Sequence, residues 1–300
     1  MKHTIRQYGP VVILLACILA LAVGVTALLG GYTVTPTQRQ EVLATTYPIY
    51  VAAQRILGGD TDVTLTRLDG AASGCLHDYQ MSPADRRAVH QADLILMNGA
   101  GAESFLHGMV AEEKCVDTSK GIDLLCADHH HDHGEEEHPH ETYNEHLWLS
   151  PSLYAKQVLA VMNALIALDA AHGETYRSNA ENYLRHIDYI DQQMKDLSAA
   201  LRGTPCVLFH DSMAYLAADL GLDVRLTLSV EGESGLSAHD LGEVEELARQ
   251  HPNLLLLYDT QYALRYEGVA GTAVTICTAV QEDWLSAMYA NLTTLKQVAG

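Results

Sequence analysis

The sequence predicts an α/β protein with two four-stranded parallel sheets, which are flanked by helices and separated by one long helix. Short apolar runs alternate with helical patterns along most of the chain, and this alternation is typical of parallel sheets covered on both faces. A long apolar stripe at spacings of three and four residues divides the alternation into two sets of four strands. The 300 residues are enough for two sizeable cores.

The first set of strands is expected at residues 42–45, 63–68, 93–98 and 122–126, with helices at 48–57, 82–92 and 102–113. Pro48 suits the first turn of the first helix, and Gly58 and Gly59 end that helix. Ser82 and Pro83 make a similar start for the second helix, because serine is a preferred N-cap and proline is tolerated in the first turn.

The long helix is expected at residues 174–202, after a shorter helix that Ser150 and Pro151 start and that runs to about residue 168. At 1.5 Å per residue the long helix measures roughly 43 Å, which is enough to span two lobes. Its apolar stripe consists of Tyr176, Ala180, Tyr183, Ile187, Ile190, Met194, Leu197 and Leu201.

The second set of strands is expected at residues 206–209, 224–228, 254–258 and 273–277, with helices ending at Leu220 and covering 237–250 and 282–298. Ligands of open parallel sheets bind beyond the carboxyl ends of the strands. His77, His210 and Asp259 all follow expected strands at such ends.

The charge of the chain excludes one class of partner. The formal net charge is −20, with only 18 lysines and arginines, whereas phosphate binding needs clustered basic residues. We therefore expect no nucleic-acid partner, and an attraction for cations.

The N-terminus predicts export and membrane association. Residues 11–29 are apolar and uncharged after Lys2 and Arg6, about the length of one membrane-spanning helix. Residues 1–32 are therefore a signal peptide or an N-terminal membrane anchor, and Cys17 is a candidate lipidation site. Exported chains can form disulfides, and the pairs expected first are Cys115 with Cys126 and Cys206 with Cys277.

Histidines are concentrated before the long helix. Residues 128–151 hold seven of the sixteen histidines and no lysine or arginine, and neutral imidazoles beside carboxylates are ligands for metals such as zinc. The composition of residues 128–141 predicts a disordered loop that collects metal, or a solvated insertion without a role. The accessory metal ligands expected there are His129, His130, His131, His133, His138 and His140.

Several segments together resemble one known family. They are residues 46–50 (TYPIY), 76–79 (LHDY), 92–93 with 98–103, 146–151 (HLWLSP), and 209–211 with 215–216. In this order they are similar to the zinc/manganese solute-binding proteins of ABC importers (cluster A-I), which include the high-affinity zinc-uptake binding proteins. The resemblance covers nearly everything after residue 40.

The resemblance implies two lobes joined by one rigid helix, with a divalent metal ion held between them. The lobes are expected at residues 41–172, which include the His-rich loop at 128–141, and at 203–300, with the linking helix at 173–202. The implied protein is not an enzyme but an extracytoplasmic monomer, at the cell surface or in the periplasm, that delivers its metal to an ABC permease.

The family's metal ligands fall on His77, His146 and His210 of this chain. Asn144 and Glu145 replace the Asp-Pro pair that usually precedes the second histidine, and Ala279 occupies the place of a fourth, acidic ligand. Water or a carboxylate such as Asp259 would then complete a tetrahedral site, and Glu231 and Glu233 are weaker candidates. Three imidazoles favour Zn²⁺ over Mn²⁺, because carboxylate oxygens suit the harder ion.

Three alternatives to a zinc-delivering protein are open. One is a manganese-specific binding protein. Another is a secreted zinc-dependent hydrolase, because three histidines and a water molecule also form a catalytic site; no general base accompanies them in the sequence. A third is a passive metal buffer that uses only the His-rich loop.

Overall fold

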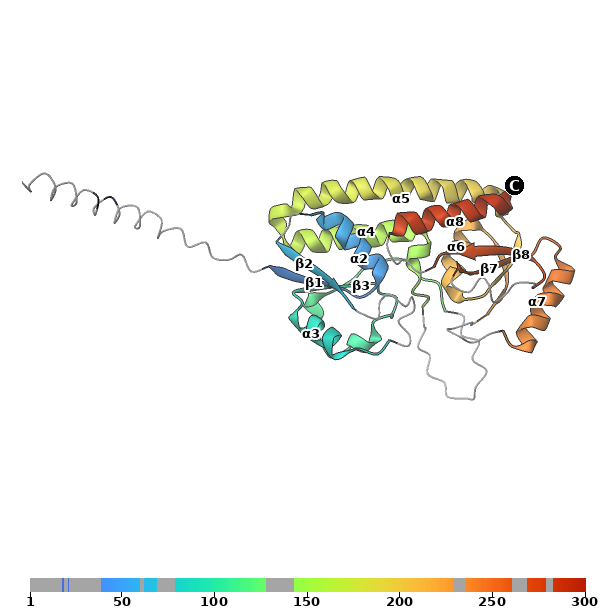
Figure 1. Ribbon diagram of the computed structural model, residues 1–300, viewed down its shortest axis with the longest axis horizontal. Coiled ribbons are helices and arrows are strands. Elements are labelled where there is room, and N and C mark those ends of the chain that lie inside the picture. The colour runs from blue at the N-terminus through green and yellow to red at the C-terminus, as the bar shows by residue number, and fades with distance from the viewer. Residues whose placement is uncertain are drawn as a thin grey trace, which may run out of the picture. The chain divides into compact units, whose positions relative to one another are not determined.

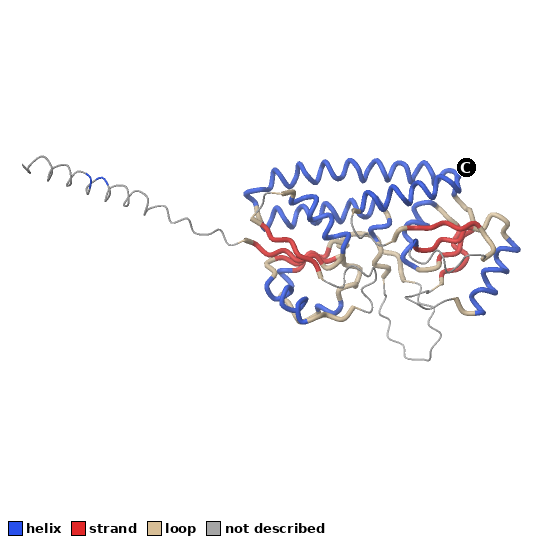
Figure 2. Tube along the Cα trace, viewed as in Figure 1, coloured by secondary structure: helices blue, strands red, loops and turns tan. Residues whose placement is uncertain are grey.

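Two parallel sheets of four strands each lie along one long helix, α5 (Gly173–Leu201) (Figure 1, Figure 2). The computed structural model describes residues 39–59, 62–68, 79–127, 143–228, 236–260, 269–278 and 283–300, together with Ile18 and Leu21. The chain divides into Met1–Arg39 and Gln40–Gly300, and the second of these contains both sheets. The expected fold class is confirmed.

The first sheet has the order β2-β1-β3-β4. Its strands are β1 (Gln40–Ala44), β2 (Val63–Arg67), β3 (Leu94–Met97) and β4 (Cys115–Asp117). Val42 pairs with Leu65 on one side and with Leu94 on the other. Val42 faces the core shared with α5, and Leu43 faces a second cluster under α3 (Pro83–Gln91). Apolar layers on both faces explain the apolar runs at residues 42–44 of β1 and Leu94–Met97 of β3.

The second sheet repeats this arrangement in the order β6-β5-β7-β8. Its strands are β5 (Pro205–Leu208), β6 (Asp223–Thr227), β7 (Leu255–Asp259) and β8 (Thr272–Ile276). Cys206 and Leu208 face the shared core, whereas Val207 packs with Val244 of α7 (Ala238–Gln250) on the other face. The two central strands of each sheet are therefore buried on both sides.

The remaining helices are α2 (Tyr47–Leu57), α4 (Pro151–Leu168), α6 (Ala214–Leu220) and α8 (Trp284–Ala299). Every residue of the apolar stripe predicted for α5 is buried, which confirms that the stripe faces the core. Of the described helices, α4 alone has the length and hydropathy of a membrane span. Tyr154, Val158, Val161 and Leu165 of α4 are completely buried in the shared core, as expected for a core helix of a globular protein.

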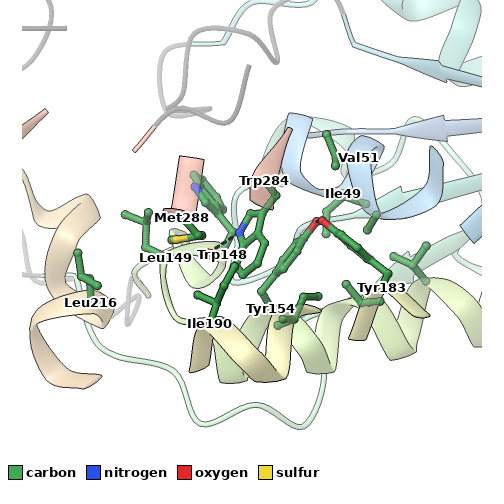
Figure 3. Packing of buried hydrophobic residues seen from close by; sticks show 14 of the residues in the cluster. Ile49, Val51, Trp148, Leu149, Tyr154, Tyr183, Ile190, Leu216, Trp284 and Met288 are labelled. Atoms are coloured by element: carbon green, nitrogen blue, oxygen red, sulfur yellow. Dashed lines mark hydrogen bonds between the residues drawn. The ribbon is translucent and has the colours of Figure 1, made fainter. Parts of the chain in front are cut away.

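One hydrophobic core runs through both halves of the chain. Figure 3 shows Trp284 of α8 lying on Tyr154 of α4, and the two rings stack with centroids 4.4 Å apart. Trp284 Nε1 donates a hydrogen bond to the backbone oxygen of Trp148 (2.8 Å), and Asp283 forms an ion pair with Arg55 of α2 (2.7 Å). The C-terminal helix therefore crosses back and packs on the first half.

Two predicted elements of the first half are wrong. The fourth strand is not residues 122–126 but β4. Ile122 is apolar because it packs with Tyr215 of α6, and Cys126 makes only an isolated bridge to Tyr143. The helix expected at residues 102–113 is instead a set of turns around two short 3-10 helices, Ser104–Leu106 and Glu112–Lys114. The left-handed backbone of Gly101 and Gly108, with φ of 87° and 72°, interrupts a helix there.

The two expected disulfides are also absent among the described cysteines. Cys206 lies on β5 and Cys277 follows β8, and β7 lies between these strands. Two strand spacings amount to about 10 Å, which exceeds the Cα separation of about 7 Å that a disulfide tolerates. Cys115 begins the edge strand β4, and its thiol contacts Ala111 O (3.8 Å) rather than Cys126.

Candidate metal centre

Two histidines from different halves of the chain meet at the carboxyl ends of the sheets. His146 directly precedes the 3-10 helix η4 (Leu147–Leu149), which leads into α4. His210 follows β5 and caps the 3-10 helix η6 (Asp211–Met213). Their ring centroids are 5.6 Å apart and the rings are nearly perpendicular, at 85°. The structure thus brings together two of the predicted ligands that are 64 positions apart in sequence (210 minus 146).

A carboxylate completes this group. The ligand atoms of His146, His210 and Asp211 all lie within 4.8 Å of one another. Ligand atoms of a tetrahedral zinc ion are about 3.3 Å apart, because Zn–N distances are about 2.0–2.1 Å. Small side-chain rotations are therefore enough to close the three groups around one ion. Sequence reasoning missed Asp211, although its position next to His210 in the same turn was an available signal.

The imidazole of His210 has two neighbours at the same nitrogen. Ser212 N lies 3.0 Å from His210 Nδ1 and can donate a hydrogen bond to it, while Asp211 Oδ1 lies 3.1 Å from the same atom. Nδ1 of the neutral ring is thus the acceptor of the Ser212 N–H and carries no proton, and Asp211 Oδ1 lies at about the separation of two ligand atoms of one zinc ion.

His146 is held in a closely packed environment and is only 2% exposed. Its Nδ1 lies 3.1 Å from Asn144 Oδ1, and its ring centroid is 5.1 Å from that of Trp148. Leu147 and Leu149, on either side of Trp148, are completely buried. Asn144 and the buried turn that leads into α4 therefore fix the imidazole.

Asp259, the predicted carboxylate ligand, ends β7 and is 7% exposed. Its Oδ2 accepts hydrogen bonds from the backbone and hydroxyl of Thr278, and Thr278 O accepts one from Trp148 Nε1 (2.9 Å). Asp259 is thus linked to the neighbourhood of His146 through Trp148, but it is not in the group of three within the described residues.

The other predicted ligands lie outside the described residues. These are His77, the six accessory histidines of residues 128–141, Glu231 and Glu233; Ala279, which stands in the place of the family's acidic ligand, lies outside them as well.

A buried polar network supports the segment that carries His146. Glu103 accepts hydrogen bonds from Thr45 Oγ1 (2.5 Å), Asn98 N (2.7 Å) and Gly99 N (3.1 Å). Burial raises the pKa of this carboxyl to about 7, against the opposing effect of the three donors. Asn98 Nδ2 in turn donates to the backbone oxygen of Glu145 (2.9 Å), the residue before His146.

Comparison with known proteins identifies the family. Residues 42–298 match the family model described as zinc-uptake complex component A, periplasmic (ZnuA). The chain belongs to this family. Among curated ZnuA-family relatives, the high-affinity zinc uptake system protein ZnuA of Bacillus subtilis is 26% identical over 274 residues, which cover 86% of this chain and 82% of the relative.

Two solved structures share the fold of this chain. The Zn(II)-bound ZnuA-like domain of Streptococcus pneumoniae AdcA superposes with a TM-score of 0.69 at 20% identity, over 87% of this chain and 99% of that domain. FpvC of Pseudomonas aeruginosa, solved in complex with Mn²⁺, gives 0.69 at 20% identity, over 87% and 98%. Because ZnuA-family proteins are solute-binding components rather than enzymes, the hydrolase alternative is set aside.

Proposed function

We propose that this protein is the extracytoplasmic zinc-binding component of an ABC importer, which captures Zn²⁺ between its two halves and delivers it to a membrane permease. The observation that carries the proposal is the meeting of His146 and His210 beside Asp211. Each histidine comes from a different half and is positioned by a separate sheet or helix, so that both halves are needed to form the group.

The chemistry of the donors favours zinc. Two imidazoles with one carboxylate match the nitrogen and oxygen ligands of tetrahedral zinc, whereas Mn²⁺ prefers mainly oxygen ligands. We assign His146 and His210 as ligands, and His77, whose sequence position lies between β2 and α3, as the third. Asp211 is the fourth, with Asp259 as the alternative. A ZnuA-like relative of the same fold is named for binding Zn(II), which supports the choice of metal.

The remaining sequence expectations complete the proposal. Residues 41–172 and 203–300 act as the two metal-binding lobes on either side of the linking helix, and residues 1–32 export the chain or anchor it to the membrane. The histidines of residues 128–141 collect zinc for the metal centre. The protein acts as a monomer, and its protein partner is the permease.

Zinc titration of three variants tests the proposal. Deletion of residues 128–141 should remove weak sites and leave one tight zinc ion. Additional substitution of His146 or His210 by alanine should abolish that tight site, because each removes a ligand. His239→Ala is the matched control, since this α7 histidine is 82% exposed in its side chain and lies outside the group.

Calorimetry with zinc and manganese measures both stoichiometry and metal preference. A loop-deleted protein that binds no tight zinc would identify a passive buffer instead. Tighter binding of manganese than of zinc would contradict the choice of metal.

A further inference from the structure

Asn144 connects the two halves of the metal centre through both ends of its side chain. Its Oδ1 accepts a hydrogen bond from the backbone N–H of His146 (2.9 Å) and lies 3.1 Å from Nδ1 of that ring. Its Nδ2 donates to the backbone oxygen of Asp211 (2.8 Å) in the other half. Asn144 as a whole is 2% exposed, so these bonds form away from water.

The orientation of this amide follows from backbone chemistry alone. A backbone N–H can only donate, so the atom that faces the N–H of His146 must be the amide oxygen. A backbone carbonyl can only accept, so the atom that faces Asp211 O must be the amide nitrogen. Both ends agree, and the usual ambiguity of an asparagine amide does not arise.

The fixed amide determines the tautomer of His146. Because Asn144 Oδ1 only accepts, the neighbouring Nδ1 of a neutral His146 must carry the proton. The Nε2 atom of this tautomer carries no proton, and its lone pair is the donor that a metal ion requires.

The backbone of Asn144 is fixed as well. Asn144 N donates to Leu125 O (2.8 Å), and Asn144 O accepts from the hydroxyl of Tyr215 of α6 (2.9 Å). Burial raises the pKa of Tyr215, so its phenol keeps the proton that it donates. Two residues of the second half therefore hold Asn144: Tyr215 binds its backbone oxygen, and the backbone oxygen of Asp211 binds its side chain.

We propose that Asn144 is the positioning residue of the metal centre: it presets the Nε2 ligand of His146 and ties the His210–Asp211 turn to the same point. This inference rests on the proposed function for its zinc readout. Aspartate at this position would keep the acceptor for His146 but would lose the donor to Asp211 O. Asparagine is thus the residue type that serves both contacts.

Histidine tautomers in the metal-free protein test the claim that Asn144 presets the Nε2 ligand of His146. The full chain in detergent micelles, labelled with ¹⁵N-histidine, is recorded by long-range ¹H–¹⁵N correlation at about pH 8, where imidazole is neutral. His146→Gln assigns the His146 signals. We expect the Nδ1–H tautomer in the wild type and in Asn144→Asp, and a mixture of tautomers in Asn144→Ala.

Zinc affinity, measured by chelator competition, tests the claim that Asn144 ties the His210–Asp211 turn to the metal centre. Asn144→Ala should bind zinc about 10–100-fold more weakly, the usual cost of losing a partner of a metal-ligating histidine. Asn144→Asp should also bind more weakly, because it loses the bond to Asp211. Asn179→Ala is the matched control: it removes an asparagine-to-carbonyl bond of 2.9 Å to Ile56 O, between α5 and α2, and should alter neither tautomer nor affinity.

The outcomes separate this inference from the proposed function. Retention of the pure Nδ1–H tautomer in Asn144→Ala, or unchanged zinc affinity in that variant, would overturn the inference. Loss of the tautomer in Asn144→Asp would overturn it too, and this result stands even if the alanine variant does not fold. If the wild type binds no tight zinc, only the proposed function is contradicted. The inference about Asn144 is still tested, because the tautomers are measured without metal.

Discussion

Glu103 should make the protein less stable as the pH rises through the acidic range. Its carboxyl is almost completely buried, and burial raises its pKa from 4.5 to about 7. Between these two pH values the folded state holds a proton that the unfolded state has released. The free energy of unfolding contributed by Glu103 is therefore fully present below about pH 4.5 and is lost as the pH rises to about 7.

The size of the effect follows from the shift. One pKa unit corresponds to about 1.36 kcal/mol, so a shift from 4.5 to about 7 corresponds to about 3 kcal/mol. This is a large part of the 5–15 kcal/mol that is typical of a folded domain. Asn98 links Glu103 to the backbone of Glu145, so this carboxyl belongs to the network that supports the segment carrying His146.

Urea unfolding of wild type and Glu103→Gln at a series of pH values isolates this contribution. Glutamine does not titrate, so histidines and the net charge affect both proteins alike and cancel in the difference. The unfolding free energy of wild type minus that of the variant should fall by about 3 kcal/mol from pH 4.5 to pH 7. Glu112→Gln, an exposed control, should give no such change.

The opposite slope would refute this reasoning. If the hydrogen bonds from Thr45, Asn98 and Gly99 outweighed burial, the pKa of Glu103 would lie below 4.5. The difference between wild type and Glu103→Gln would then rise with pH.

Four further predictions concern the core, the surface, the thiols and the metal. Trp284→Ala should lower the free energy of unfolding in urea by about 3–5 kcal/mol, because it removes a completely buried ring stacked on Tyr154. A loss below about 1 kcal/mol would contradict the packing of α8 in the shared core. Arg55→Met should cost less than about 1 kcal/mol in the same assay, because Arg55 is 48% exposed in its side chain and surface ion pairs contribute little. Burial raises the pKa of the Cys206 thiol to about 12, so mass spectrometry should find this thiol unmodified after alkylation of the native protein. Rapid alkylation of Cys206 in the native protein would contradict its burial. Zinc affinity measured by chelator competition should fall as the pH is lowered, because protons compete with the metal for imidazole nitrogens; pH-independent affinity would argue against histidine ligands.

The sequence predicts the helices and most strands because their patterns are local. The eight apolar residues of α5 repeat at helical spacing, and all eight are buried. Ser82 caps α3 in a capping box with Asp85, which the Ser-Pro start indicated. The failures at residues 102–113 and 122–126 have a common cause: apolar residues there pack against distant elements, while left-handed glycines fix the turns.

The metal centre is less accessible to prediction than the fold. His210 could be placed because it follows a buried strand, and His146 because it starts a helix. Asn144 could not, since its role depends on a hydrogen bond to Asp211, 67 positions away. Asp211 forms part of the group only because the turn after β5 approaches the start of α4, and this approach is set by the packing of the shared core.

The position of bound zinc tests the central claim most directly. Crystals of residues 40–300, grown with one equivalent of zinc and measured at the zinc absorption edge, report this position without assumptions about ligands. We expect one dominant anomalous peak about 2.0–2.1 Å from an imidazole nitrogen of both His146 and His210. A dominant peak elsewhere, with these two rings bound to no metal, would contradict the claim that the two halves hold zinc between them.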